Sequence, residues 1–364
     1  MTFPTTEQIS DVASGRWIEI LRALAPGVSD AADNLGKHVT CPLHGGERDF
    51  RFHKDKGPET GLSHCTCGTR DGYQLLRDLN NWSFIEAKEA VADYLGIAQD
   101  DPKHRAELAR KAKEERLQRE SIRRAKAERE AEEVARCRNG LWERSYSIQS
   151  KKAALARRYL MGRGLTPDVV TNHVRFHPGV PVRDEDGAIV AFAPAIIARV
   201  YSNNGRPLTL HRTYLDHNTG KKLDCDEPKK LMPVPDLWAA EKGRVIPVTA
   251  GGDGSVLGVA EGIETAIAAH MGTQIPVWAT VSAGPMRHFE PPASVKTLVI
   301  FADLDASGTG LDAAKALSEN LSASGWPGRV IIRLPPEHLL KGRSSIDWAD
   351  VFYEHGAMGF GVAA

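Results

Sequence analysis

The sequence predicts a multidomain α/β protein, and three features of the chain lead to this prediction. From about residue 244 onward, short apolar runs alternate with helical patterns, which is typical of an open, mostly parallel sheet covered by helices. The N-terminal region instead carries a cluster of cysteine and histidine, a common sign of a small metal-stabilised fold. Between them lies a stretch of mainly Lys, Arg, Glu and Ala without Gly or Pro, which is typical of a long exposed helix.

Composition narrows the classes of function. The chain has 364 residues and a formal net charge of zero, so its overall charge favours neither a nucleic acid nor a membrane as partner. It contains no apolar run long enough to span a bilayer, and its N-terminus lacks the basic and apolar segments of a secretory signal. We therefore expect a cytoplasmic protein with no membrane partner, whose five cysteines stay reduced as metal ligands or lone core thiols.

Changes in composition divide the chain into four expected domains. Residues 1–100 hold the Cys/His cluster, residues 101–140 form a charged helical linker, residues 141–243 form a basic α+β segment, and residues 244–364 form the α/β domain. The linker is either a solvated spacer or a helix that places its modest positive excess along a phosphate backbone. In the third domain, Asn-Gly and Thr-Gly turns separate strand patterns and predict hairpins.

Four candidate ligands for one metal ion lie in the first domain: Cys41, His44, Cys65 and Cys67. A closed tetrahedral Zn²⁺ site takes four N or S ligands, usually as two close pairs brought together by a hairpin. The strand-like segment 49–52 and the turn-like segment 57–61 would let the two pairs meet. Because the second pair is Cys-x-Cys, tighter than the usual Cys-x-x-Cys, His53 or His64 could replace one of its members.

Aromatic and basic residues alternate close to these ligands. Phe50 and Phe52 are flanked by Arg48, Arg51 and Lys54. Such a mixture suits base stacking with phosphate contacts on a single strand. The other interpretation is that the two phenylalanines form the small core of a ribbon.

Carboxylates follow two of the apolar runs in the C-terminal domain. Glu261 comes after the run 255–260, and Asp303 and Asp305 come after the run 297–302. Ligands of α/β sheets bind beyond the carboxyl ends of the strands, and side chains two apart on an extended chain point the same way. Acidic oxygens gathered there suit a Mg²⁺ ion that also holds substrate phosphates. The expected chemistry is phosphoryl transfer.

Basic residues cluster on the strand-rich segment just before these acids: Arg199, His211, Arg212, Lys229 and Lys230. If the strands pair, Arg199 and Arg212 could lie on one face beside the metal pocket, where cations would hold a template backbone or a triphosphate. Ordinary surface charge is the alternative.

Taken in order, these motifs resemble those of bacterial-type primases of the Toprim class, and most closely the plasmid- and phage-encoded primases with a zinc ribbon. The resemblance covers nearly the whole chain apart from the charged linker. It rests on the metal-ligand segments and on five further motifs, at 71–76, 210–214, 228–231, 261–266 and 301–305. Segments 282–284 and 347–350 fall where that family has a small-residue loop and a late acidic motif. The chain departs from the family at Thr265, where many bacterial primases have an acid; Glu264 stands one position earlier.

The resemblance implies an N-terminal zinc ribbon, a basic α+β subdomain and a C-terminal Toprim parallel sheet of Rossmann-like form. It implies a DNA primase, a nucleotidyltransferase that makes short RNA primers on single-stranded DNA from nucleoside triphosphates, with structural Zn²⁺ and catalytic Mg²⁺ or Mn²⁺. The expected ligands of the catalytic ion, of which the first three are also catalytic, are Glu261, Asp303, Asp305, Asp347 and Asp350. Glu261 is either a ligand or the general base. Glycines at a helix start would let backbone N–H groups approach phosphate. The expected nucleotide or template contacts are Arg199, Arg212, Lys229, Lys230, Ser282, Gly284, Gly308 and Gly310.

Two other functions fit the same motifs. The metal pocket could cleave nucleic acid, as other Toprim proteins do, or the chain could be an inactive adaptor that binds single strands and recruits a helicase. No phosphate-binding loop of the Gly-x-x-x-x-Gly-Lys type is present, so we expect an unwinding helicase to come from another chain.

Overall fold

The computed structural model describes residues 3–97, 101–184, 187–225, 227–235, 238, 240–340 and 342–361. The chain divides into two compact units, Met1–Lys126 and Ala127–Ala364. In the described part of the chain, no helix combines the length and the apolar character needed to cross a membrane.

The first unit is a small helical domain around one core. Three of its helices begin at capping boxes formed by Thr5, Asp71 and Ser83, which explains where they start. Its helices before the linker are α1 (Thr6–Ala13), α2 (Trp17–Leu24), α3 (Ser29–Asp33), α4 (Lys56–Thr60), α5 (Gly72–Asn80) and α6 (Phe84–Tyr94). Its antiparallel sheet contains β1 (Arg51–Phe52), β2 (Ser63–Cys65) and β3 (Gly68–Arg70), in that order.

The side chains of Phe50 and Phe52 are 1% and 0% exposed and belong to the core of this unit. Base stacking on these two rings is therefore excluded, and the core interpretation holds. Arg48, Arg51 and Lys54 remain exposed.

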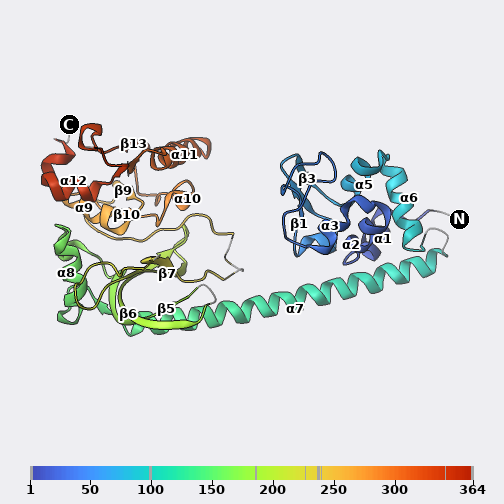
Figure 1. Cartoon of the computed structure of the whole chain (residues 1–364), viewed down its shortest axis with the longest axis horizontal. Helices are drawn as coiled ribbons and strands as arrows, with labels where there is room; N and C mark the ends of the chain where they lie inside the picture. The colour runs from blue at the N-terminus through green and yellow to red at the C-terminus, as the bar shows by residue number, and fades with distance from the viewer. Residues whose placement is uncertain are drawn as a thin grey trace. The chain divides into compact units, whose positions relative to one another are not determined.

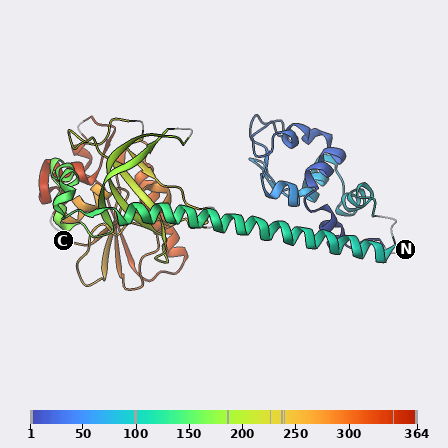
Figure 2. The ribbon, with the colours of Figure 1, turned by 90° about the horizontal axis from the view of Figure 1, so that it is seen from below.

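The charged stretch is the helix α7 (Pro102–Glu143), which is continuous across the boundary between the units (Figure 1 and Figure 2). Within the first unit, Arg116 forms an ion pair of 3.1 Å with Asp11. Within the second unit, the buried Leu141 and the half-buried Trp142 pack on a face of the antiparallel sheet. Each end of α7 is therefore bound by side-chain contacts to its own unit.

The second unit begins with an antiparallel sheet in the order β4-β5-β6-β7-β8. Its strands are β4 (Tyr146–Ser147), β5 (Val174–Arg183), β6 (Ile189–Tyr201), β7 (Pro207–Tyr214) and β8 (Lys229–Leu231). The helix α8 (Ala154–Gly162) packs on this sheet. Ile196, Ala198 and Val200 of β6 point into the same core as the C-terminal domain, while Ala195 and Ile197 point to the opposite face, toward Leu141.

The rest of the second unit is a parallel sheet in the order β10-β9-β11-β13. Helices α9 and α12 contribute to the core on one face, and α10 and α11 contribute to the core on the other, which is why the strands are nearly continuous apolar runs. Its main elements are β9 (Val256–Ala260), α9 (Ile263–Thr273), β10 (Val277–Ala279), α10 (Ala283–Met286), β11 (Thr297–Phe301), α11 (Thr309–Ala323), β13 (Arg329–Arg333) and α12 (Trp348–His355). A short antiparallel pair, β12 (Leu304–Asp305) with β14 (Ser345–Ile346), brings the segment before α12 to the segment before α11. The predicted multidomain α/β class is confirmed.

Candidate functional site

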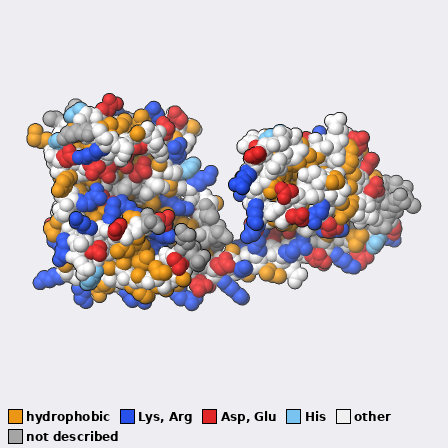
Figure 3. Space-filling model, viewed as in Figure 1, with side chains coloured by type: hydrophobic (Ala, Val, Ile, Leu, Met, Phe, Trp, Pro, Cys, Tyr) orange, Lys and Arg blue, Asp and Glu red, His pale blue; other side chains and the backbone are white. Residues whose placement is uncertain are grey.

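Two acids stand at the carboxyl ends of the central parallel strands. Ala260 of β9 pairs with Phe301 of β11, so Glu261 and Asp303, which follow these strands, leave the sheet at the same edge. Over the second unit in Figure 3, acidic side chains gather next to a band of lysine and arginine side chains.

Asp303 is the most strongly perturbed acid of the site. Burial, followed by the charges of Asp347, Glu261 and Asp305, raises the pKa of its carboxyl group from the ordinary 3.8 to about 8. Its Oδ1 atom is buried and has no hydrogen-bond partner among the described residues. An unpartnered buried oxygen beside other carboxylates costs free energy in the absence of a cation.

Glu261 points toward the loop between β10 and α10. Burial raises the pKa of its carboxyl group, which accepts a hydrogen bond from the backbone N–H of Ala283 and is repelled by Asp305. Ser282 and Gly284 flank that N–H group, so the small-residue loop lies beside Glu261. Val281, at the start of the loop, has φ 73°, a conformation that is rare for a β-branched residue and costs of order 1–3 kcal/mol.

Asp305 caps the start of α11. Its carboxylate accepts hydrogen bonds from the Ser307 hydroxyl and from the backbone N–H groups of Thr309 and Gly310, the latter two at 3.2 and 3.1 Å. The hydrogen bond from Ser307 is the main reason that the pKa of Asp305 is lowered. Gly310 is required here, because a Cβ atom on it would lie 2.6 Å from the carbonyl oxygen of Asp303. The helix-start N–H groups expected to approach phosphate are thus bound to Asp305, and Gly308 adopts the left-handed turn before them with φ 72°.

Asp347 and Asp350 form the capping box of α12. Asp347 accepts a hydrogen bond of 2.8 Å from the backbone N–H of Asp350, and the Asp350 carboxylate accepts one of 3.3 Å in return. Burial raises the pKa of Asp347, and its charge acts on Asp303, whereas Asp350 is not among the main charges that do. The charges of Glu261, Asp305 and Asp347 therefore all act on Asp303, while Asp350 is turned to the helix start. In the described part of the chain, the ligand atoms of these acids do not lie close enough together to form a ready-made metal site.

The chemistry of these four acids suits a divalent cation. They offer only hard oxygen ligands, burial and then the neighbouring charges raise the pKa of Asp303, and one buried oxygen lacks a partner among the described residues. Mg²⁺ and Mn²⁺ prefer such ligands and are commonly held by a few carboxylates together with substrate phosphates.

The basic residues fall on two faces of the antiparallel sheet. Lys229 lies on the face toward the acids, because its ammonium forms a 2.8 Å ion pair with Glu264 of α9. Lys230 is its neighbour on β8 and pairs in register with Arg212, so both point to the opposite face. There they line a cavity of about 910 Å³ together with Arg183 and Tyr214.

Arg199 and Arg212 do share a face, but it is the face away from the acids. The guanidinium of Arg199 lies 4.3 Å from the ring centre of Trp142 at the end of α7. The two arginines therefore do not lie beside the metal pocket, as was expected. Successive residues of β6 and β7 point to opposite faces of the sheet, and the register of the two strands determines which face each arginine occupies. His211 is buried on the acid side, and burial lowers its pKa to about 4, so it is neutral at pH 7.

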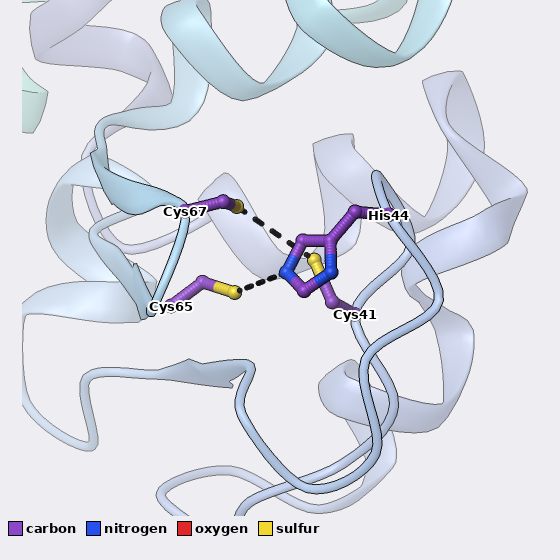
Figure 4. Close-up of side chains that lie close together, drawn as sticks. All are labelled: Cys41, His44, Cys65 and Cys67. Carbon is purple, nitrogen blue, oxygen red and sulfur yellow. Dashed lines mark hydrogen bonds between the residues drawn. The ribbon is translucent and has the colours of Figure 1, made fainter.

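In the first unit, the four predicted metal ligands meet (Figure 4). All four ligand atoms lie within 4.8 Å of one another, with 3.2 Å between His44 Nε2 and Cys65 Sγ and 4.0 Å between Cys41 Sγ and Cys67 Sγ. Burial opposes ionisation of Cys65, but hydrogen bonds from the backbone of Cys67 and from His44 lower its pKa to about 6. A thiolate at neutral pH is the form that binds metal, and one nitrogen with three sulfurs fits tetrahedral Zn²⁺. His53 and His64 lie outside this group.

Three residues near the acids were missed by reasoning from the sequence: Tyr159, Arg163 and Lys222. Tyr159 donates a hydrogen bond to Glu264, and the charges of Lys222 and Arg163 act on the same carboxylate. The charge of Arg163 also offsets part of the rise in the pKa of Asp347 that burial causes. The one available signal was Glu264 itself, a charged residue inside the apolar pattern of α9.

Comparison with known families adds one decisive match. Residues 256–358 match the Toprim domain. The chain therefore contains a C-terminal Toprim domain, and Glu261, Asp303, Asp305, Asp347 and Asp350 all lie within it. Residues 132–240 match a domain of unknown function (DUF7146). No curated protein matches the chain.

Three solved structures share some of its fold. They are the DnaG primase catalytic domain bound to ssDNA (18% identity, TM-score 0.43, 62% of this chain and 76% of that one), a DNA primase domain from Pseudomonas aeruginosa (16%, 0.41, 62% and 76%), and the Aquifex aeolicus primase with its zinc binding and RNA polymerase domains (14%, 0.40, 94% and 83%).

Proposed function

We propose that the chain is a DNA primase that joins nucleoside triphosphates into short RNA primers on single-stranded DNA. The observation that carries the proposal is the buried, unpartnered oxygen of Asp303 among three other acids, at the carboxyl ends of the two central strands of the Toprim domain. Such a site holds a divalent cation where phosphates can reach it.

In this mechanism, Asp303, Glu261, Asp305 and Asp347 would hold Mg²⁺ or Mn²⁺. The bound cation supplies neutralisation of triphosphate charge and a lower pKa for the attacking 3′-hydroxyl. Asp303, ionised once a cation balances its neighbours, supplies a ligand oxygen that the fold leaves unpaired. Glu261 is fixed by the N–H of Ala283, which suits a ligand better than a general base that must move a proton.

The two faces of the basic sheet take different parts of the substrate. Lys229 faces the acids and is placed to contact the triphosphate. Arg212 and Lys230 line the cavity on the opposite face, with Arg183 and Tyr214, and we assign them to the template strand rather than to the triphosphate. Arg199, under Trp142, supports the end of the linker helix instead.

The remaining parts are assigned by position in the chain. Residues 1–100, with Zn²⁺ on the Cys/His group, would engage the template through exposed cations such as Arg48 and Arg51. Residues 101–140 link this part to the basic segment 141–243 and the catalytic segment 244–364. The free cysteines suit the reducing cytoplasm, and the helicase would be a separate chain.

The test is incubation with labelled single-stranded DNA, ribonucleotides and Mg²⁺, with products separated by length. Products that grow with ribonucleotides support priming. Products shorter than the template would instead indicate a nuclease, and binding without any product would indicate an adaptor. Asp303→Asn should abolish synthesis, while Asp312→Asn, the same change at an exposed acid on α11, should leave it intact.

A further inference from the structure

An ion pair between a buried glutamate and a partly exposed lysine joins the basic sheet to the Toprim domain beside the acids. Glu264 of α9 has a side chain only 6% exposed, and its Oε2 atom accepts a hydrogen bond of 2.8 Å from the ammonium of Lys229. Its Oε1 atom accepts a hydrogen bond of 2.6 Å from the hydroxyl of Tyr159 on α8. Three separate elements, α8, β8 and α9, thus meet at one carboxylate.

The charges around this carboxylate keep it ionised. Burial alone would raise its pKa, but the ammonium groups of Lys229 and Lys222 and the two hydrogen bonds lower the pKa below its ordinary value. The Lys229 charge also acts on Asp303, where it offsets part of the rise in pKa that burial and the neighbouring acids cause. One ammonium therefore acts on both Glu264 and the acidic cluster.

Lys229 is held at one side only. Its side chain is 36% exposed, and among the described residues Glu264 is its one hydrogen-bond partner. An ammonium has three N–H donors, so two remain for a ligand.

A purely structural role is a poor explanation of this pair. Neighbours of Glu264 on α9, such as Ala266 and Ile267, are 0% exposed, so an apolar side chain would suit the position. Burying the Glu264 charge costs desolvation free energy, and replacing buried charges by apolar residues is often neutral or stabilising, so the pair is weak evidence for a role in stability. In protein kinases, a glutamate holds the lysine that contacts the phosphates through this kind of ion pair.

We propose that Glu264 and Tyr159 are positioning residues that hold the Lys229 ammonium beside the acidic cluster, where it binds the triphosphate of the incoming nucleotide. Tyr159 fixes the far oxygen of the carboxylate, so the near oxygen keeps its direction toward β8. This inference rests on the proposed function, because it takes the ligand at the acids to be a nucleoside triphosphate.

The experiment measures binding, by calorimetry, of a non-hydrolysable nucleoside triphosphate analogue to the full chain in Mg²⁺. Lys229→Met should weaken affinity by about tenfold or more, the usual worth of a charge-assisted hydrogen bond. Glu264→Gln, which keeps the shape but not the charge, should weaken it by about tenfold, and the double variant should bind no worse than Lys229→Met alone. Tyr159→Phe should weaken it by about threefold, and Lys229→Arg, which can keep the ion pair, should retain most of the affinity.

Lys221→Met is the matched control, because Lys221 is an exposed lysine eight residues before Lys229, and this variant should bind as the unmodified protein does. Circular dichroism and thermal unfolding check that each variant folds. If Glu264→Gln does not fold, the affinities of Tyr159→Phe and Lys229→Met test the proposal instead. Affinity that is unchanged or tighter in a folded Glu264→Gln, or additive losses in the double variant, would overturn the proposal.

The outcome also separates this inference from the proposed function. If the unmodified protein makes no primers but the binding pattern holds, the primase proposal fails and the positioning of Lys229 stands. If primers are made while Glu264→Gln binds and synthesises normally, the positioning fails and the primase proposal stands.

Discussion

Replacing Asp303 with asparagine should stabilise the metal-free protein even though it removes the activity. The folded-state pKa of Asp303, about 8, lies well above the ordinary 3.8 expected in the unfolded chain. Each unit of that gap corresponds to about 1.4 kcal/mol, so full ionisation of Asp303 costs the fold on the order of 5 kcal/mol. Asparagine resembles the protonated acid in shape and carries no charge, so it avoids this cost.

The sign of the pH dependence follows from proton binding. Between pH 4 and pH 8 the folded state keeps a proton on Asp303 that the unfolded state has released, so raising the pH lowers the free energy of unfolding. This contribution is fully present below the unfolded pKa and is lost as the pH rises through the folded one. The asparagine variant has no such pH dependence, so its stability advantage over the unmodified protein should grow from about 2 kcal/mol at pH 5 to about 5 kcal/mol near pH 8.

The assay is urea unfolding of both proteins in EDTA at several pH values, followed by the same series with Mg²⁺. Mg²⁺ should stabilise the unmodified protein, because it binds the folded state only, and should stabilise Asp303→Asn much less. Asp312→Asn serves as the control at an exposed acid. If Asp303→Asn is less stable than the unmodified protein at pH 8 in EDTA, or if the difference does not change with pH, the argument for a crowded buried carboxylate is refuted.

Three further outcomes follow from the structure. Asp305→Ala should lower the free energy of unfolding by about 1 kcal/mol, the usual cost of losing a helix cap, besides abolishing synthesis; an unchanged stability in urea would contradict the cap. Lys230→Met should weaken single-stranded DNA binding and reduce the salt slope of the binding constant by about one, while leaving triphosphate affinity unchanged, whereas equal losses of both would place Lys230 with Lys229. Removing Zn²⁺ with a chelator, or replacing Cys41 by serine, should lower the thermal stability of the first unit and weaken template binding, and Cys137→Ser, at an exposed thiol outside the group, should change neither.

The sequence predicted the Toprim sheet well because its signals are local. The apolar runs at 255–260 and 297–302 correspond to β9 and β11, and the helical patterns after them correspond to α9 and α11. The end of α5 is likewise local, because it falls at Asn81 in the left-handed conformation, which Asn adopts more readily than most residues.

Two local features differ from the sequence expectation. The strand β6 runs through Pro194, although proline usually interrupts a strand, because Pro194 lies opposite a bulge of β5 where the hydrogen-bond ladder is already interrupted. The expected turn at 57–61 is the short helix α4, which ends at Gly61 with φ 70°.

The site was harder to predict where it depends on register. The pairing of β7 with β8 determines that Lys229 faces the acids and that Lys230, its neighbour, points to the opposite face of the sheet. The pair between Glu264 and Lys229 joins residues 35 apart in the sequence through a partly buried contact that no local pattern encodes. The gathering of the acids depends in turn on β12 pairing with β14, which carries Asp347 to the strand end near Asp303.

The double duty of Asp305 and Asp347, each a candidate cation ligand and each an N-terminal cap, links ion binding to the rigidity of two helices. A bound cation can draw the carboxylate away from the backbone N–H groups of the first turn, which loosens the helix cap. Alternatively, the cation and the N–H groups bind the carboxylate together, which makes the cap more rigid. Amide hydrogen exchange at Thr309, Gly310 and Asp350 would therefore report occupancy of the acidic cluster, without a substrate or a label.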